Sequence, residues 1–183
     1  MSMHERKARV IALLTAGLLA GSLYAQGSPR FPELKARNLA GSDLSLPKDF
    51  GSPIALVFVA FAMKQQSDID AWKPFVDALR AKRPALPVWE LPTIGSGYKF
   101  MQGIIEGGMR SGIKADAARA STVTLYLDAA DFAERIGSSG LGEIAVLVVT
   151  PEGRILARAA GKPNAASEET LAKAIGTALG ASR

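Results

Sequence analysis

The chain of 183 residues contains no cysteine and only one histidine, His4. Without cysteine it can form neither a disulfide nor a thiolate nucleophile, so thiol–disulfide exchange and thiol peroxidase chemistry are excluded. Without a second histidine, the residues after position 4 cannot assemble a Ser–His–Asp or Cys–His mechanism. Zinc, haem and copper sites built on these side chains are excluded in the same way. We therefore expect no metal, no cofactor and no enzymatic activity.

Phosphate-binding and nucleic-acid-binding signals are also absent. The only Gly-Lys pair, Gly161-Lys162, is followed by Pro163 and lacks the glycines of a Walker or dinucleotide motif. The net charge is +5 for the whole chain. It falls to +3 after residues 1–25, because that stretch holds three of the 22 basic and one of the 17 acidic residues. This excess is spread along the chain, so we expect no nucleic-acid partner.

The N-terminus has the pattern of a secretory signal peptide. Arg6, Lys7 and Arg9 precede an apolar stretch of small residues, Val10–Ala25, and a polar segment follows. We predict a signal peptide at residues 1–25, cleaved near Ala25, and a periplasmic or otherwise exported protein. Two alternatives stay open: an uncleaved membrane anchor, although the stretch is shorter than the roughly 20 residues that span a bilayer, and a soluble tail.

The remaining chain predicts a lead-in segment at residues 26–40 and one domain at residues 41–183. Ile54–Phe61 is a continuous apolar run, typical of a central strand covered on both faces. Next, apolar residues at helical spacing predict a helix that is capped by Ser67, kinked at Pro74 and ended by residues 83–84. Residues 87–91 resume an extended pattern, which we expect Pro92 to close.

The second half alternates in the same way. Residues 95–113 predict an irregular helix weakened by glycines, and residues 122–127 predict a strand followed by a short helix at 128–136. Residues 144–150 and 154–159 flank a tight turn, Pro151-Glu152-Gly153. A last helix, capped by Ser167, is expected to run to about Leu179. This order predicts an α/β fold: a central mixed sheet with helices on both faces, and a C-terminal β-hairpin and helix.

The stretch Gly41–Phe61 (GSDLSLPKDFGSPIALVFVAF) resembles the entry to thioredoxin-like redoxins, and Ala145–Gly161 is similar to the closing hairpin of that fold. In those proteins the redox cysteines follow the central strand; here residues 62–67 (AMKQQS) hold none. The residue before the closing hairpin is usually a cis-proline; here Glu143-Ile144 stands in its place. The resemblance therefore implies a thioredoxin-like fold that is redox-inactive.

A narrower resemblance comes from the middle of the chain. Residues 90–93 (ELPT), 107–110 (GGMR) and 124–128 (TLYLD), with Phe132, look like bacterial relatives of the mitochondrial ATP synthase assembly-factor family. This resemblance implies a chaperone role without catalysis. That family works on the inner face of the coupling membrane, whereas the predicted signal peptide sends this protein outside. The resemblance can thus imply the fold and the lack of catalysis without implying that this protein has the same partner.

The first candidate site is the cysteine-free slot, Met63, Lys64, Gln65 and Gln66. Glutamines beside an adaptable methionine suit a groove for a peptide or protein partner, and the alternative is a vestigial loop. Glu143 joins this candidate site because it stands in the cis-proline position.

Two further candidates lie in the second half of the chain. Arg110, beside Met109 and between glycines, could bind a carboxylate or phosphate; the alternative is an ordinary surface arginine on a weak helix end. Tyr126 and Asp128 could form a polar pair at the end of a strand; the alternative is a core tyrosine and a helix N-cap.

Together these features predict an exported, non-catalytic binding module of the thioredoxin fold, with a protein partner and a chaperone or assembly role for a membrane protein complex. Two alternatives stay open: a small-ligand carrier, which a deep apolar pocket near Tyr98–Met109 would favour, and an enzyme that uses carboxylate, tyrosine and arginine chemistry. The sequence leaves the partner and the oligomeric state open.

Overall fold

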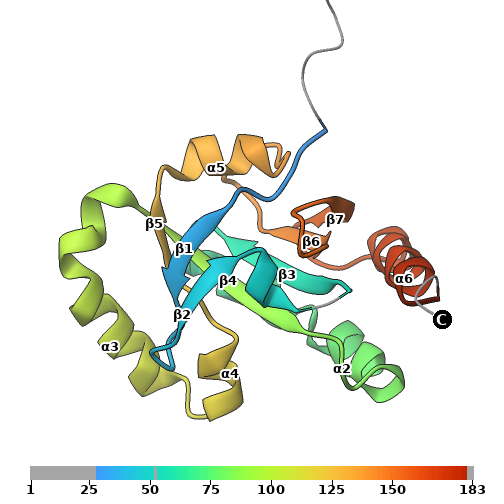
Figure 1. Cartoon of the computed structure of the whole chain (residues 1–183), viewed down its shortest axis with the longest axis horizontal. Helices are drawn as coiled ribbons and strands as arrows, with labels where there is room; N and C mark the ends of the chain where they lie inside the picture. The colour runs from blue at the N-terminus through green and yellow to red at the C-terminus, as the bar shows by residue number, and fades with distance from the viewer. Residues whose placement is uncertain (1–27, 52, 181–183) are drawn as a thin grey trace, which may run out of the picture.

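The computed structural model describes residues 28–51 and 53–180, and the predicted signal peptide at residues 1–25 lies outside them. The elements follow one another along the chain as shown in Figure 1. They are β1 (Leu34–Arg37), β2 (Asp43–Leu46), η1 (Lys48–Phe50), β3 (Ala55–Ala60), η2 (Met63–Gln65), α1 (Gln66–Asp70), α2 (Lys73–Lys82), β4 (Val88–Gly95), η3 (Ser96–Met101), α3 (Gln102–Gly112), α4 (Asp116–Ala120), β5 (Leu125–Leu127), α5 (Ala129–Arg135), β6 (Ala145–Val149), β7 (Ile155–Ala160) and α6 (Ala165–Gly180).

Five strands form the central sheet in the order β5-β4-β3-β6-β7. The strand β3 pairs in parallel with β4 and antiparallel with β6, and β4 pairs in parallel with β5. Every residue of β3 is buried, as the continuous apolar run predicts for a strand covered on both faces. The predicted mixed sheet is confirmed, and so is the closing hairpin, whose strands β6 and β7 flank residues 150–154.

The two faces of the sheet carry two apolar layers. On one face, Val57 and Val59 of β3 pack in a cluster with Phe132 and Ile136 at α5 and with residues of the β1–β2 hairpin. On the other face, neighbouring β3 residues pack in a cluster with Trp72, with α2 and with Ile175 of α6. Period-two alternation along β3 produces this division. The prediction of helices on both faces is confirmed.

The expected single helix kinked at Pro74 is wrong in detail. The chain forms two helices, and Pro74 lies in the first turn of α2, where its missing N–H costs no helical hydrogen bond. The strand expected to close at Pro92 continues to Gly95. Pro92 is tolerated because it pairs with Ala60, the last residue of β3, whereas the pairing with β5 starts only at Thr93.

Both predicted N-caps are wrong: Ser67 is the second residue of α1, whose N-cap is Gln65, and Ser167 does not cap α6. The helix begins at Ala165, and Asn164 is the residue before it. The Asn164 side-chain oxygen accepts from the Ser167 backbone N–H at 3.0 Å, while the Ser167 hydroxyl accepts from the Asn164 backbone N–H at 2.9 Å. This is a reciprocal capping arrangement, so Ser167 serves as its third helical position and not as the cap.

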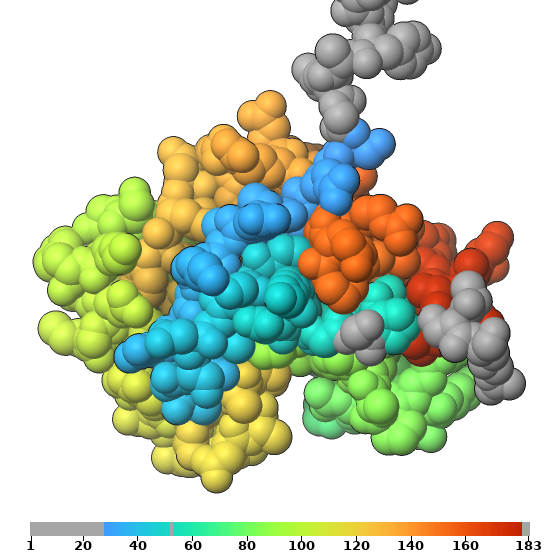
Figure 2. Space-filling view, in the orientation of Figure 1, coloured from blue at the N-terminus to red at the C-terminus, as the bar shows by residue number. Residues whose placement is uncertain are grey.

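The segment before Gly41 takes part in the packing. Phe31 is buried, and its ring makes edge contacts with Phe50, at a centroid distance of 5.0 Å, and with Phe132, at 5.6 Å. Figure 2 shows this segment in blue, running across the face of the molecule. Residues 31–46 thus help to cover one face of the sheet.

Within the described ranges, no helix is both long and apolar enough to cross a membrane.

Candidate functional site

The loop that follows β3 is held in place by one buried side chain, Gln65. Its side-chain oxygen accepts hydrogen bonds from the backbone N–H groups of Phe61, at 2.7 Å, and Ala62, at 3.2 Å. Its side-chain nitrogen donates to the carbonyl oxygen of Leu141, at 2.8 Å. Gln65 is only 2% exposed, so it ties this loop to the loop at residues 138–143 and is not itself available to a partner.

Three exposed side chains, on the two loops that Gln65 joins, lie near this hydrogen bond in the sequence. Met63 is 95% exposed, Lys64 is exposed, and Leu141 is 40% exposed. We call Met63, Lys64 and Leu141 the Met63 surface. An almost fully exposed methionine on a fixed loop offers a soft apolar contact that adapts to irregular partners.

A hollow adjoins this surface. A cavity of about 310 Å³ opens beside Leu141, lined by α5 and by the loop that follows it. Its lining residues are Ala130, Ala133, Glu134, Gly137, Ser138, Ser139, Gly140 and Leu141. Glycines and alanines at its wall leave room for a partner side chain, because they project little of their own into it.

Gln66 and Glu90 lie on the α1 side of the loop. Gln66 is exposed and donates to the Asp70 carboxylate at 3.1 Å. Burial raises the pKa of the Glu90 carboxyl on β4, and the charge of Asp70 raises it further, while a hydrogen bond from Gln66 opposes both effects. The sequence did not single out Glu90 as functional; an acid between the apolar residues Trp89 and Leu91 of a strand is the signal it gave.

Glu143, the residue in the cis-proline position, is exposed and shares the loop at 138–143 with Leu141. Its carboxylate lies against Gly161, where an added Cβ would come within 2.8 Å of it. The carbonyl of Gly161 accepts a hydrogen bond from the buried Trp72 indole at 2.9 Å. Glu143 thus lies two residues from Leu141, the partner of Gln65, and the binding role of these residues stays a prediction.

Tyr126 lines a second, larger cavity of about 460 Å³, and Met109 is linked to it through Thr124. The Thr124 hydroxyl donates to the Met109 sulfur at 3.5 Å, and both Thr124 and Tyr126 line the cavity. The cavity lies between the β1–β2 hairpin, β5 and the η3–α3 segment. Its lining residues are Leu34, Lys35, Ala36, Arg37, Asp43, Leu44, Lys99, Gln102, Thr124, Leu125, Tyr126 and Leu127.

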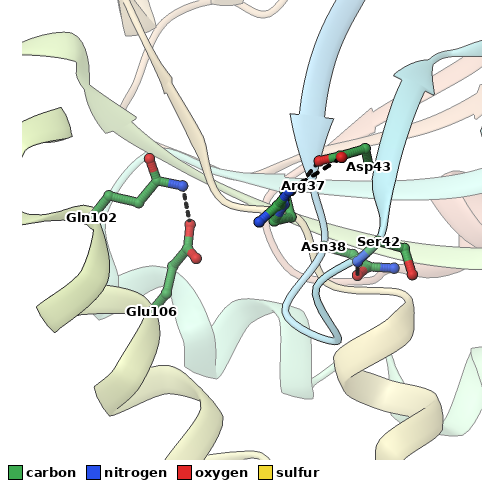
Figure 3. A network of polar contacts seen from close by, with 6 residues as sticks. All are labelled: Arg37, Asn38, Ser42, Asp43, Gln102 and Glu106. Atoms are coloured by element: carbon green, nitrogen blue, oxygen red, sulfur yellow. Dashed lines mark hydrogen bonds and ion pairs between the residues drawn. The ribbon is translucent and has the colours of Figure 1, made fainter.

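Polar side chains of the hairpin and of α3 line this cavity, and Figure 3 shows the hydrogen bonds that they make. On the hairpin, Arg37 donates two hydrogen bonds to Asp43, at 2.8 and 3.1 Å. On α3, Gln102 donates to Glu106 at 2.7 Å, and Glu106 is buried. The Tyr126 hydroxyl is also buried, and it has no hydrogen-bond partner in the described part of the chain. Burial raises the pKa of Tyr126, and the charge of Glu106 raises it further.

The other two candidate residues lie apart from this cavity. Arg110 is exposed on α3 and is not among the residues that line it. Asp128 precedes α5, and its carboxylate accepts from the backbone N–H groups of Ala130, at 2.9 Å, and Asp131, at 3.0 Å. Asp128 is therefore a helix N-cap. Sequence reasoning missed Arg37, Gln102 and Glu106, because these residue types are usually solvent-facing.

Comparisons with known proteins agree on the fold. No protein-family model matches the chain, and no curated protein matches it. Among solved structures, BsSco, "a member of the Sco family of cytochrome c oxidase assembly proteins", superposes with a TM-score of 0.55 at 13% identity. That match covers 82% of this chain and 94% of BsSco.

Two further structures give the same picture. The pneumococcal exposed lipoprotein thioredoxin Etrx1 of Streptococcus pneumoniae strain TIGR4 has a TM-score of 0.52 at 13% identity, covering 80% of this chain and 99% of that chain. A hypothetical protein of Sinorhizobium meliloti 1021, SMc02350, has a TM-score of 0.50 at 13% identity, with 84% of each chain covered.

The chain has a thioredoxin-like fold, as the redoxin resemblance predicts. It carries this fold without a cysteine, so the thiol chemistry that "thioredoxin" names in one of these neighbours is impossible here. The narrower resemblance to the ATP synthase assembly-factor family stays a prediction.

Proposed function

We propose that this protein is an exported, non-catalytic binding module that holds an apolar segment of a protein partner at the Met63 surface. The observation that carries the proposal is the loop after β3: Met63 is 95% exposed while the buried Gln65 fixes the backbone beneath it. A side chain this apolar gains free energy when a partner covers it. A fixed loop also loses little conformational entropy on binding.

The hollow beside Leu141 supports the same function. A peptide that covers Met63 and Leu141 can place one side chain in the cavity of about 310 Å³. A chaperone or assembly role for a membrane protein complex fits such a module. BsSco, a structural neighbour, is described as one of the cytochrome c oxidase assembly proteins, and Etrx1 is described as an exposed lipoprotein. Export of this chain rests on the predicted signal peptide.

Site-specific photo-crosslinking in cells tests the proposal. A photo-reactive amino acid replaces Met63 in a tagged full-length protein, and the matched control carries it at Glu169, an exposed position on α6. We expect Met63 to crosslink to one protein that Glu169 does not capture. The substitution Leu141→Asp should abolish that product. A Met63 probe that captures the same proteins as the Glu169 probe, or none, would show that this surface is not the binding site.

The cavity of about 460 Å³ favours a second candidate function, a small-ligand carrier, because it lies at the Tyr98–Met109 segment and is lined by Tyr126, whose buried hydroxyl has no hydrogen-bond partner among the described residues. Native mass spectrometry of the protein purified from its own cells tests this function. A carrier should show an added mass that disappears when the half-buried Leu44 is replaced by tryptophan to fill the cavity. A bare protein mass in both samples argues for the first function.

A further inference from the structure

The segment at residues 96–114 exposes an unusual amount of apolar surface. Phe100 is 85% exposed, Ile104 is 74% exposed and Tyr98 is 58% exposed. Phe100 and Ile104 are four residues apart at the junction of η3 and α3, so they lie on one face of the helical segment. Half of the exposed large hydrophobic side chains in the described residues thus fall within seven consecutive positions. A single exposed apolar side chain is ordinary, but a cluster marks an interaction surface.

The charges of the same segment have one sign. Lys99, Arg110 and Lys114 are exposed. The only acidic residue between positions 96 and 114 is Glu106, which is 5% exposed and turned toward Gln102 on the inner side of α3. The exposed charged side chains of this segment are therefore all cations, and it has no exposed carboxylate of its own. We call residues 96–114 the α3 face.

The position and backbone of α3 make this face accessible. In Figure 1 the helix stands at the outer edge of the molecule, beyond β5, and in Figure 2 the same segment forms a projecting lobe. Four glycines of the α3 face, Gly103, Gly107, Gly108 and Gly112, have open space where a Cβ would lie. With no side chains at these positions, a flat surface can approach the helix backbone closely.

We propose that the α3 face binds the surface of an anionic lipid bilayer, with Phe100 and Ile104 entering the headgroup region. Aromatic and aliphatic side chains beside lysine and arginine are the composition of helices that lie in the membrane interface. Tyrosine, with its apolar ring and polar hydroxyl, suits the same layer. A second copy of this chain is a poorer occupant, because two α3 faces would bring like charges together. The α3 face would hold the protein at the membrane while the Met63 surface binds its partner.

The absence of cysteine allows a direct test, because one introduced cysteine gives one labelled site. An environment-sensitive fluorophore is attached to full-length protein at Gly103→Cys on the α3 face, and in the matched control at Glu169→Cys on α6. Vesicles of phosphatidylcholine with phosphatidylglycerol are compared with vesicles of phosphatidylcholine alone. The probe at position 103 should shift to the blue and become shielded from an aqueous quencher only on the anionic vesicles. The probe at position 169 should not respond.

Two variants quantify the contributions. Replacing Phe100 and Ile104 together by serine should reduce the response of the position-103 probe roughly tenfold or more at a given lipid concentration. Replacing Arg110 by glutamine should weaken binding about fivefold, and added salt should weaken it in the same direction. The control Met63→Ser should leave vesicle binding unchanged, which separates this proposal from the proposed function. Because all of these positions are exposed, each variant should keep its unfolding midpoint.

Three outcomes would overturn the proposal. The first is a position-103 probe that stays fully quenched on anionic vesicles, even if the apolar N-terminal segment attaches the protein to them. The second is equal shielding on neutral and anionic vesicles. The third is a photo-reactive group at position 100 that crosslinks in cells to a protein and not to lipid, which would assign the α3 face to a protein partner.

Discussion

The side-chain amide of Gln65 and the carbonyl of Leu141, 2.8 Å apart, join two loops that are 76 residues apart in the sequence. One of these loops follows the central strand β3, and the other precedes β6 on the same sheet. Because β3 and β6 are neighbouring antiparallel strands, the loop after β3 and the loop before β6 lie at the same end of the strand pair. This hydrogen bond therefore determines how the two halves of the Met63 surface are spaced.

Replacing Gln65 by alanine should destabilise the protein by about 2–3 kcal/mol, because it leaves two backbone N–H groups and one carbonyl without their buried partner. Urea unfolding monitored by circular dichroism measures the loss. The matched control is Lys64→Ala, an exposed neighbour on the same loop that should change stability by less than about 0.5 kcal/mol. Equal effects of the two substitutions would contradict the role given to Gln65.

Replacing Gly153 by alanine should cost about 2 kcal/mol or more. Its φ is +81°, a conformation that side chains disfavour, and an added Cβ would lie 2.6 Å from the carbonyl oxygen of Phe31. The control is Gly107→Ala on α3, where the Cβ meets open space and alanine should stabilise the helix by about 0.5–1 kcal/mol. The midpoints of thermal and of urea unfolding should both fall for Gly153→Ala and both rise for Gly107→Ala.

The Glu90 carboxyl should make the protein less stable as the pH rises. Its pKa is raised in the folded state by burial and by Asp70, so the folded protein holds this proton more tightly than the unfolded chain does. The resulting stabilisation is complete below the ordinary pKa of a glutamate and is lost as the pH rises through the raised value. Glu90→Gln should flatten this part of the stability profile and make the protein more stable at neutral pH.

The measurement is the free energy of unfolding by urea at a series of pH values from acid to neutral. The control, Glu169→Gln, removes an exposed carboxyl on α6 and should keep the slope of the original protein. A Glu90→Gln profile that runs parallel to the original would mean that Glu90 titrates alike in the folded and unfolded states.

Replacing Asp128 by alanine should cost about 0.5–2 kcal/mol, because the first turn of α5 loses the acceptor for two backbone N–H groups. Asp128→Asn keeps an acceptor oxygen and should retain most of the stability. Denaturant unfolding of both variants tests this difference. If alanine and asparagine behave alike, Asp128 acts through something other than the cap.

The fold could be predicted because its signals are local and mutually consistent. The apolar run at residues 54–61 is long enough for a strand and too short for a helix, and Pro151-Glu152-Gly153 predicts its turn within three residues. The predictions that were wrong concern the effects of prolines and the residues that cap helices. Whether Pro74 kinks a helix or starts one depends on where the preceding helix ends, which residues 66–72 decide through tertiary packing. Asn164 and Ser167 are both good caps, and only the structure chose between them.

The candidate site could be predicted only in part. The missing cysteines pointed to residues 63–66, and this loop does carry the exposed Met63. The internal role of Gln65 could not be predicted, because its partner Leu141 becomes a neighbour only when β3 and β6 pair. The polar residues around the cavity beside Tyr126 could not be predicted for a similar reason. Glu106 lies in a glycine-weakened helix, where an acid is expected to face solvent, but it is buried.

The first described residues complete the packing from the opposite end of the chain. The Arg30 guanidinium donates to the carbonyl of Glu152 at 2.6 Å, across 122 residues of sequence, and the Phe31 backbone N–H donates to the carbonyl of Gly153. These contacts raise the contact order, which slows folding. A chain that is made from its N-terminus has this segment ready first and can use it only when the β6–β7 turn exists. Folding of this face therefore has to wait until the β6–β7 turn has been synthesised.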